Sequence, residues 1–268
     1  MLDLPRSARL AAWGTAVLAG DAGIDDAVRA VTQDDEPHAV LLDPDPDVPG
    51  IGLRDLLWHF VEAGVTGLRV VLPAPGDPLG LPGPPAFNTL ALEAGECVLT
   101  QPAQGREGDL DRHGGLVPTV MQFGSQWEPG AMVTWSLYPV RPLHLTAAAG
   151  LAEAERELRE ALATATDALT RLDVARWRED AADRVAAVRQ GGLPRGALPP
   201  SAPPRSVQVL ATAARVRAIV ELATEDDGAA VSGYEAQQRA QTLRGLAGVS
   251  RRAMAAAVNG LLEPRFGP

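Results

Sequence analysis

Apolar and polar positions in the first part of the chain predict two helices, followed by a strand, a helix and a strand. Residues 10–17 and 24–31 carry apolar side chains at the i, i+3, i+4 spacing of an amphipathic helix. Short apolar runs at 38–43 and 66–73 are typical of buried strands, and a helical pattern at 52–64 separates them. Because the connections are short, we expect a right-handed crossover with the two strands parallel.

Beyond residue 89 the apolar positions alternate with a period of two, as they do in half-buried strands. The segment 90–100 therefore predicts a hairpin that turns at Ala94-Gly95. A second hairpin is predicted for 115–123 and 131–140, joined by the turn residues 124–130. Together these segments predict a mixed sheet of about six strands with flanking helices.

Helical periodicity takes over in the second half of the chain. Small and large apolar residues recur every seven positions along a coiled-coil-like seam, at Leu151, Leu158, Ala165 and Leu172. A Pro-rich linker at 191–206 follows, and a further helix is predicted up to residue 225. Ser232 and Glu235 then form a capping box for a last helix.

The predicted fold class is therefore α+β, with an all-α helical bundle or arm after the sheet. We expect an acidic mixed α/β domain at 1–146 and a helical domain at 147–268. The helix at 204–226 is apolar over a wide arc, which predicts a central position between its neighbours.

Composition and charge narrow the functional classes. The 268 residues are 46% hydrophobic and 22% charged, as in ordinary globular proteins. The net charge of −10 is uneven, because residues 1–146 hold 19 acidic residues and 8 arginines, whereas 147–268 hold 15 and 16. An acidic first half repels phosphate backbones and the balanced second half offers no basic face, so we expect no nucleic-acid partner.

Three features of the sequence bear on the compartment. No apolar stretch reaches the roughly 18–20 residues that span a bilayer, so no membrane partner is expected. The Ala-rich N-terminus carries Asp3, Arg9 and Trp13, which are typical of a first helix and not of an export signal. The single cysteine, Cys97, excludes an intramolecular disulfide and a multi-cysteine zinc site. We therefore expect a cytoplasmic protein.

Two loops hold the candidate ligand-binding residues. The Pro-rich loop 73–88 leaves the carboxyl end of a predicted strand, where open α/β sheets bind ligands, and it contains Asp77 and Asn88. A stiff connection without any ligand explains the same prolines. The Gly-rich segment 104–115 contains Asp111 and His113, a pair that can act as an oriented general base.

Other polar groups have simpler interpretations. The alternating Asp43, Asp45 and Asp47 can hold a hard cation, but the intervening prolines favour a solvated turn. The helical set at 55–62 (Asp55, His59 and Glu62) is typical of an exposed face. No nucleophile elbow, P-loop, dinucleotide fingerprint or H-E-x-x-H motif is present, so no catalytic residue, metal or cofactor is predicted.

The helical end of the chain, YEAQQRAQTLRGLAGVSRRAMAAAVNGLL, together with the composition rich in Ala, Gly, Pro and Arg and without lysine, resembles uncharacterised proteins of GC-rich actinobacteria. This resemblance implies no activity.

The sequence thus favours a non-enzymatic protein that binds a protein partner, or a second copy of itself as a homodimer or larger homo-oligomer, through its helical half. The alternative is a small-molecule-binding protein or enzyme with its site at the strand ends of the first domain, formed by loops 73–88 and 104–115.

Overall fold

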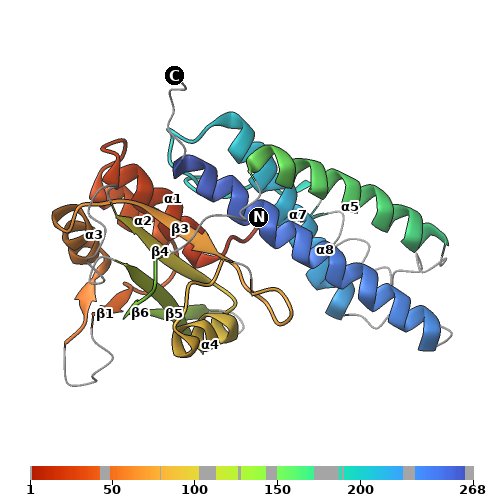
Figure 1. Ribbon diagram of the computed structural model, residues 1–268, viewed down its shortest axis with the longest axis horizontal. Helices are drawn as coiled ribbons and strands as arrows, with labels where there is room; N and C mark the ends of the chain where they lie inside the picture. Colours follow the sequence, from red (N-terminus) through yellow and green to blue (C-terminus); the bar gives the residue numbers. More distant parts are fainter. Residues whose placement is uncertain are drawn as a thin grey trace. The chain divides into compact units, whose positions relative to one another are not determined.

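The computed structural model divides the chain into a sheet unit and a helical unit, which we describe separately (Figure 1). The sheet unit comprises Pro5–Ala148, Gly196–Ala202 and Leu261–Pro268, and the helical unit the remainder. The structure describes residues 2–42, 49–78, 80–102, 113–125, 128–142, 150–171, 187–188, 190–225 and 233–262.

The sheet unit contains the predicted mixed six-stranded sheet, in the order β2-β1-β6-β5-β4-β3. The strands β1 and β6 pair parallel, and the other neighbours pair antiparallel. The strands are β1 (Ala39–Leu41), β2 (Ile51–Gly52), β3 (Val65–Val71), β4 (Cys97–Pro102), β5 (Gly114–Gly124) and β6 (Pro129–Pro139).

The prediction that the strands at 38–43 and 66–73 run parallel is wrong. β1 runs parallel to β6, and the three antiparallel pairings from β6 through β5 and β4 to β3 reverse the direction three times. β1 and β3 therefore run in opposite directions and are separated by three strands. The helix between them therefore connects two antiparallel strands that are not neighbours, and it does not form a βαβ crossover.

Helices cover the sheet on both faces (Figure 1). α1 (Arg6–Leu18), α2 (Ile24–Thr32) and α3 (Leu53–Glu62) lie on one face. The Thr15 hydroxyl of α1 donates to the Leu68 carbonyl of β3 at 3.1 Å and accepts from its N–H at 3.0 Å. Gly14 allows this close approach, because a Cβ there would collide with the Leu68 side chain. The first helix is thereby fixed against β3.

The opposite face carries α4 (Pro85–Ala94), where the sequence predicts the first half of a hairpin. That hairpin prediction is wrong, and only its second half forms a strand, β4. Proline at the start of α4 and the left-handed Gly95 at its end (φ 71°) are common helix boundaries. The two leucines at 90 and 92 produced the apparent period of two, but Phe87 and Ala91, at helical spacing, are the buried pair.

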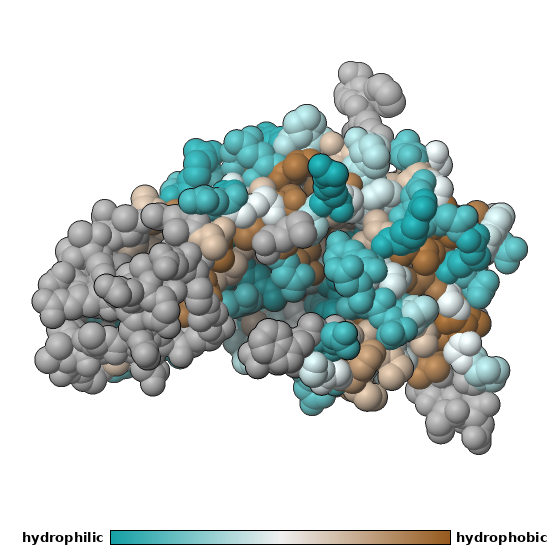
Figure 2. Space-filling view, turned by 180° about the vertical axis from the view of Figure 1, so that it is seen from behind, coloured by the Kyte–Doolittle hydropathy of each residue, from teal (hydrophilic) through white to brown (hydrophobic). Residues whose placement is uncertain are grey.

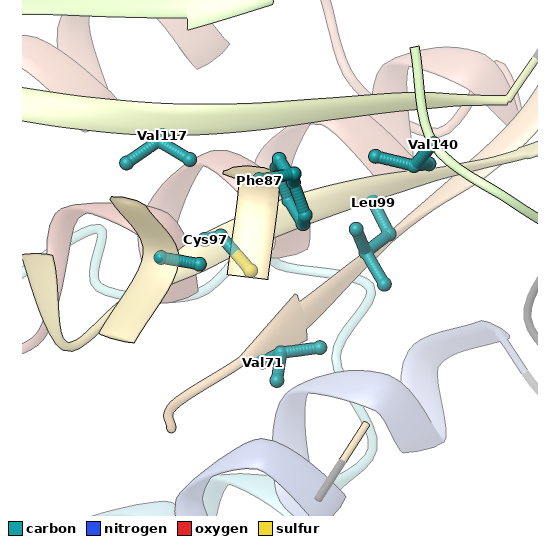
Figure 3. Packing of buried hydrophobic residues seen from close by; sticks show 7 residues of the cluster. Val71, Phe87, Cys97, Leu99, Val117 and Val140 are labelled. Carbon is teal, nitrogen blue, oxygen red and sulfur yellow. The ribbon is translucent and has the colours of Figure 1, made fainter. Parts of the chain in front are cut away.

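The core beneath α4 is small and wholly apolar (Figure 3). Phe87 and Ala91 of α4 pack on side chains from β3, β4, β5 and the end of β6, namely Val71, Cys97, Leu99, Val117 and Val140. Gly115 of β5 provides room for the Phe87 ring, which a Cβ would approach to 2.5 Å. The position of α4 over the sheet is therefore set by one aromatic anchor.

The helical unit contains α5 (Leu151–Arg171), α7 (Pro204–Glu225) and α8 (Gly233–Asn259). α8 packs along both of the others, whereas α5 and α7 meet only over a short stretch. The central helix is therefore α8 and not the predicted 204–226. Small buried residues, Ala253 and Ala257, allow both neighbours to approach α8 closely. The capping residue Ser232 and the seam residue Leu172 lie outside the described residues.

Candidate functional site

The predicted ligand-binding residues do not all meet. Asp77 closes a tight turn at the carboxyl end of β3, where its N–H donates to the Ala74 carbonyl at 2.8 Å. Gly76 makes this turn possible, since its φ is +83°. Asp111 lies outside the described residues.

Asn88 and His113 belong to segments that converge on the end of β6. The Val140 N–H donates to the His113 carbonyl at 2.8 Å, and the next N–H, that of Arg141, donates to the Gly83 carbonyl at 3.4 Å. The Asn88 side-chain oxygen accepts from the Gly83 N–H at 2.9 Å. Asn88 thus holds the turn that precedes α4, and this contact gives it a structural role.

A partly buried polar network that the sequence analysis did not predict lies between α1 and the sheet. The Arg6 guanidinium donates to both oxygens of Asp35, at 2.7 and 2.8 Å. Asp35 also lies 3.2 Å from Nε2 of His38. The Trp135 indole N–H of β6 donates to Nδ1 of His38 at 3.1 Å. Four polar side chains thereby connect α1, the segment before β1 and the centre of the sheet.

The hydrogen bonds of this network fix the protonation of His38. Because Trp135 is a donor only, Nδ1 must accept, so Nε2 carries the proton and donates to Asp35. Burial lowers the pKa of His38 below its usual value, against the raising effect of Asp35. Burial alone would raise the pKa of Asp35, but the hydrogen bonds and charges of Arg6 and His38 outweigh burial and lower it. At neutral pH the ionic pair is therefore Arg6–Asp35, and His38 is neutral.

This network has the character of a structural connection. The His38 side chain is 0% exposed, and the polar atoms of the network find partners within it. A buried imidazole that is already bonded on both nitrogens cannot accept a proton from a substrate without losing a bond.

A hollow lies beside the network, at the closed end of the β5–β6 hairpin. It has a volume of about 480 Å³. Asp34, Asp35, Gln122, Phe123, Gly124, Ser125, Gly130 and Ala131 line it. The Glu36 N–H donates to the Ala131 carbonyl at 2.9 Å and fixes the acidic segment against β6. Carboxylates and one aromatic ring therefore share this end of the hairpin.

The same hairpin has an uncovered part on the face of the sheet opposite to α1. Met121, Phe123 and Met132 are 59%, 46% and 42% exposed. Met121 pairs directly with Met132, and Phe123 follows two positions along β5, so all three side chains lie on one face. We call these three residues the hairpin patch. It lies on the face that α4 covers at Gly115 and Val117.

The size of α4 explains why the hairpin patch is open. Ten helical residues span only about 15 Å. Each strand of the hairpin has 11 residues and spans about 37 Å. α4 therefore reaches one half of the hairpin, and no described helix packs over the other half.

A second hollow, of about 430 Å³, lies beside α1. Small side chains of α1 line it, together with Thr66, Pro199, Ser201, Leu261 and Leu262, and Asp21 is its single ionisable residue. This composition provides no constellation of catalytic groups.

Asp43, Asp45 and Asp47 lie outside the described residues, and the exposed set on α3 fits its simpler interpretation. Cys97 is buried under α4, and burial raises the pKa of its thiol, as the charge of Glu96 also does. Asp55, His59 and Glu62 are exposed on α3. Within the described ranges, no three His, Cys, Asp or Glu side chains are placed to hold a metal ion. Nor does any helix in that part of the chain have the length and apolar character needed to cross a membrane.

Comparisons with known proteins identify two successive matches to family models. The model described as "Rv1486c-like protein, N-terminal domain" matches residues 7–150, and "Rv1486c-like protein, C-terminal domain" matches residues 152–255. The chain is 31% identical over 288 residues to "Uncharacterized protein Rv1486c" of Mycobacterium tuberculosis strain H37Rv, covering 96% of this chain and 97% of the relative. It is 29% identical over 297 residues to "Uncharacterized protein ML1804" of Mycobacterium leprae, with the same coverage. No solved structure matches significantly.

Proposed function

This chain belongs to the Rv1486c-like family, and we propose that it is a cytoplasmic, non-enzymatic protein that binds a protein partner through the hairpin patch. The observation that carries the proposal is the exposure of Met121, Phe123 and Met132 on one uncovered sheet face. The resemblance to actinobacterial proteins of no known activity is confirmed by the mycobacterial relatives.

The physical argument rests on the cost of leaving such side chains in water. Burying a Met or Phe side chain fully is worth about 1.5–3 kcal/mol. Three neighbouring side chains that are about half exposed therefore retain a considerable driving force for association. Methionine is common on binding surfaces because its flexible thioether adapts to different partners.

The described helices give less support to the helical half as the binding surface. In the described portions of α5, α7 and α8, Val207 is the single exposed large hydrophobic residue, at 37%. Over the residues that are not grey in the view of Figure 2, hydrophobic and hydrophilic side chains are interspersed. The proposal therefore places partner binding on the β5–β6 hairpin instead of the helices.

Photo-crosslinking in the host cell tests this proposal. A benzophenone amino acid replaces Met132 in one strain and Trp58 in another. Trp58 is a matched control, because it is 52% exposed but lies on α3. We expect one discrete adduct at position 132 that is lost when Met121 is also changed to Ser. An equal adduct at position 58, or no adduct at 132, would refute the proposal.

A small-molecule site is the second candidate function. It is favoured by one observation, that the segments of Gly83 and His113 are joined side by side on Val140 and Arg141. The Arg141 side chain is exposed there and can bind an anionic group. A thermal-shift screen with nucleotides, metals and polyamines tests this candidate. Ligand at about 100 times its Kd adds about 2.7 kcal/mol of stability, and Arg141→Gln should abolish that gain for an anionic ligand.

A further inference from the structure

We propose that the partner bound by the hairpin patch presents an extended segment, which adds to the sheet as a strand along the free edge of β5. This inference rests on the proposed function and adds the form in which the partner is recognised. The free edge is the side of β5 that faces away from β6 over residues 118–124. The backbone of β5, and not only its side chains, thereby holds the partner.

The alternation of β5 decides which of its backbone groups point outward. The Gly114 N–H donates to the Thr100 hydroxyl of β4, and the Gly114 carbonyl accepts from the same hydroxyl, so Gly114 faces β4. Every second residue after it faces the same way, because the pairing with β6 continues without a shift to Gly124. The N–H and carbonyl groups of Val120 and Gln122 therefore point away from β6.

No described strand lies beside this part of β5. The pairing of β4 with β5 extends only to Leu116. β4 begins at Cys97, and the left-handed Gly95 turns the preceding chain into α4, which lies over the face of the sheet and not in its plane. Among the described residues, the outward backbone groups of Val120 and Gln122 thus have no strand partner.

Two other edges of the sheet are protected. β3 is the last strand on its side, and the Thr15 hydroxyl satisfies both the N–H and the carbonyl of Leu68. β6 extends beyond its pairing with β1, and there the Glu36 N–H donates to the Ala131 carbonyl at 2.9 Å. Natural sheets usually cover or charge their edges, because an open edge invites another strand. The free edge of β5 has no comparable protection from a described residue.

The sequence of the free edge is suited to pairing. Residues 118–124, PTVMQFG, carry no charge, whereas exposed edges are often blocked by lysine or another charged residue. Met121 and Phe123 of the hairpin patch belong to this strand, so an added strand places its own side chains beside them. We therefore expect apolar side chains at every second position of the partner segment.

A second copy of this chain is a poorer occupant of the edge. Pro118 has no N–H and Gly124 has a left-handed φ of +89°, so they bracket a pairing stretch of about five residues, roughly 17 Å long. Such a stretch is much smaller than the roughly 800 Å² per partner of a stable complex. Antiparallel pairing of two identical edges would also place both hairpin patches on one face of the extended sheet, where they stay exposed. A different protein can add a strand and cover the patch with its remainder.

Amide hydrogen exchange in the isolated chain tests the free edge itself. The N–H groups of Val120 and Gln122 should exchange at least about 10-fold faster than those of Met121 and Phe123, which face β6. Nuclear magnetic resonance resolves these neighbouring amides. Equal protection of all four would show that the edge is already paired within the protein and would overturn the inference.

Two substitutions at one position test strand addition in the host cell. Gln122→Pro removes the outward N–H, which an edge strand tolerates because no bond within the protein is lost. Gln122→Thr is the matched control, since it also removes the glutamine side chain but keeps the N–H. Each is combined with the benzophenone at position 132. We expect the adduct to decrease at least about 5-fold with Gln122→Pro and less than about 2-fold with Gln122→Thr.

The fold of the purified Gln122→Pro variant is part of the test. Circular dichroism and urea unfolding should give a folded protein, because the lost N–H points outward. Unfolding of Gln122→Pro, with Gln122→Thr intact, would mean that this N–H is bonded within the sheet, and the inference would be wrong.

The cellular adduct separates this inference from the proposed function. If the adduct is lost with Gln122→Pro and kept with Gln122→Thr, both proposals are supported. If it is kept in both variants but lost with Met121→Ser, the hairpin patch binds a partner without strand addition. If it is lost in both variants, the partner requires the Gln122 side chain and not the edge, which also overturns the inference. If no adduct forms in the otherwise unchanged protein, the proposed function and this inference both fail.

Discussion

At the scale of single residues, His38 is a tightly constrained polar group of the sheet unit, because both of its ring nitrogens are hydrogen-bonded. It accepts a hydrogen bond from Trp135 on one nitrogen and donates to Asp35 from the other. Protonation of Nδ1 would place two N–H groups against each other and break the bond to Trp135. The network therefore stabilises the fold only while His38 is neutral.

This arrangement predicts a loss of stability in mild acid. The pKa of His38 is lowered in the folded state, so the unfolded chain binds the proton more readily. The contribution of His38 is then complete above about pH 6.5 and decreases as the pH falls below that value. Urea unfolding at pH 7.5 and 5.5 should show this decrease, and His38→Gln should reduce the difference between the two pH values. His59→Gln, on exposed α3, should leave the difference unchanged.

The Asp35 carboxylate gives a separate effect at lower pH. Its folded pKa is lowered, so its contribution is present above the ordinary value of about 3.8 and is lost as the pH falls below it. A loss confined to the range in which His38 titrates, without a second loss in strong acid, would contradict the pairing of Asp35 with Arg6.

Substitution of Arg6 tests the same pair directly. Arg6→Met leaves a half-buried carboxylate without its two charge-assisted bonds and should lower the free energy of unfolding by about 1.5–3 kcal/mol. Arg29→Met removes an exposed pair with Asp26 and should stay within about 0.5 kcal/mol. Chemical denaturation at pH 7.5 measures both variants. Equal losses would show that the Arg6–Asp35 pair stabilises the fold no more than an exposed ion pair does.

At the scale of elements, the long hairpin was predictable and the short helix α4 was not. β6 alternates between buried and more exposed positions over 131–136, whereas β5 is buried in its first half and exposed in its second, and the glycine and proline of the turn mark where the strands reverse. α4 has ten residues and only one buried pair, so two leucines with the spacing of a strand outweighed its helical pattern. Proline before it and Gly95 after it were the signals that could have identified it.

The order of the strands follows from pairings between distant segments, which no local pattern contains. β1 pairs with β6 across about a hundred residues of chain, and this pairing decides that β1 and β3 run in opposite directions. The polar network is hidden for the same reason, since Arg6 and Asp35 are 29 positions apart and His38 and Trp135 are 97 apart. The hairpin patch could not be predicted from the sequence, because its exposure depends on how little of the hairpin α4 covers.

The helical unit offers a test of element packing. Leu210 of α7 is fully buried, whereas Val207, one turn earlier, is 37% exposed. Leu210→Ala should cost about 2–5 kcal/mol, as core truncations do. Val207→Ala should cost well under 1 kcal/mol. Denaturation by urea measures both, and a loss below about 1 kcal/mol for Leu210→Ala would place α7 at the surface.

At the scale of the whole molecule, the sheet unit combines a rigid interior with one uncovered face. The polar network fixes α1 and the segment before β1 to β6, while the hairpin patch and the hollow lie at the outer end of the same hairpin. Binding surfaces on rigid elements lose little conformational entropy when they dock. The hairpin is therefore suited to present the patch to a partner.

Oxidative footprinting tests the central claim most directly. Hydroxyl radicals modify exposed methionine and aromatic side chains, and mass spectrometry reads each site in the full chain, alone or in lysate of the host. Met121, Phe123 and Met132 should become protected in lysate, while Trp58 on α3 remains reactive and serves as the internal reference. Buried Met254 should stay unreactive in both samples. Unchanged oxidation of the three patch residues relative to Trp58 would contradict the proposal that the hairpin patch binds a partner.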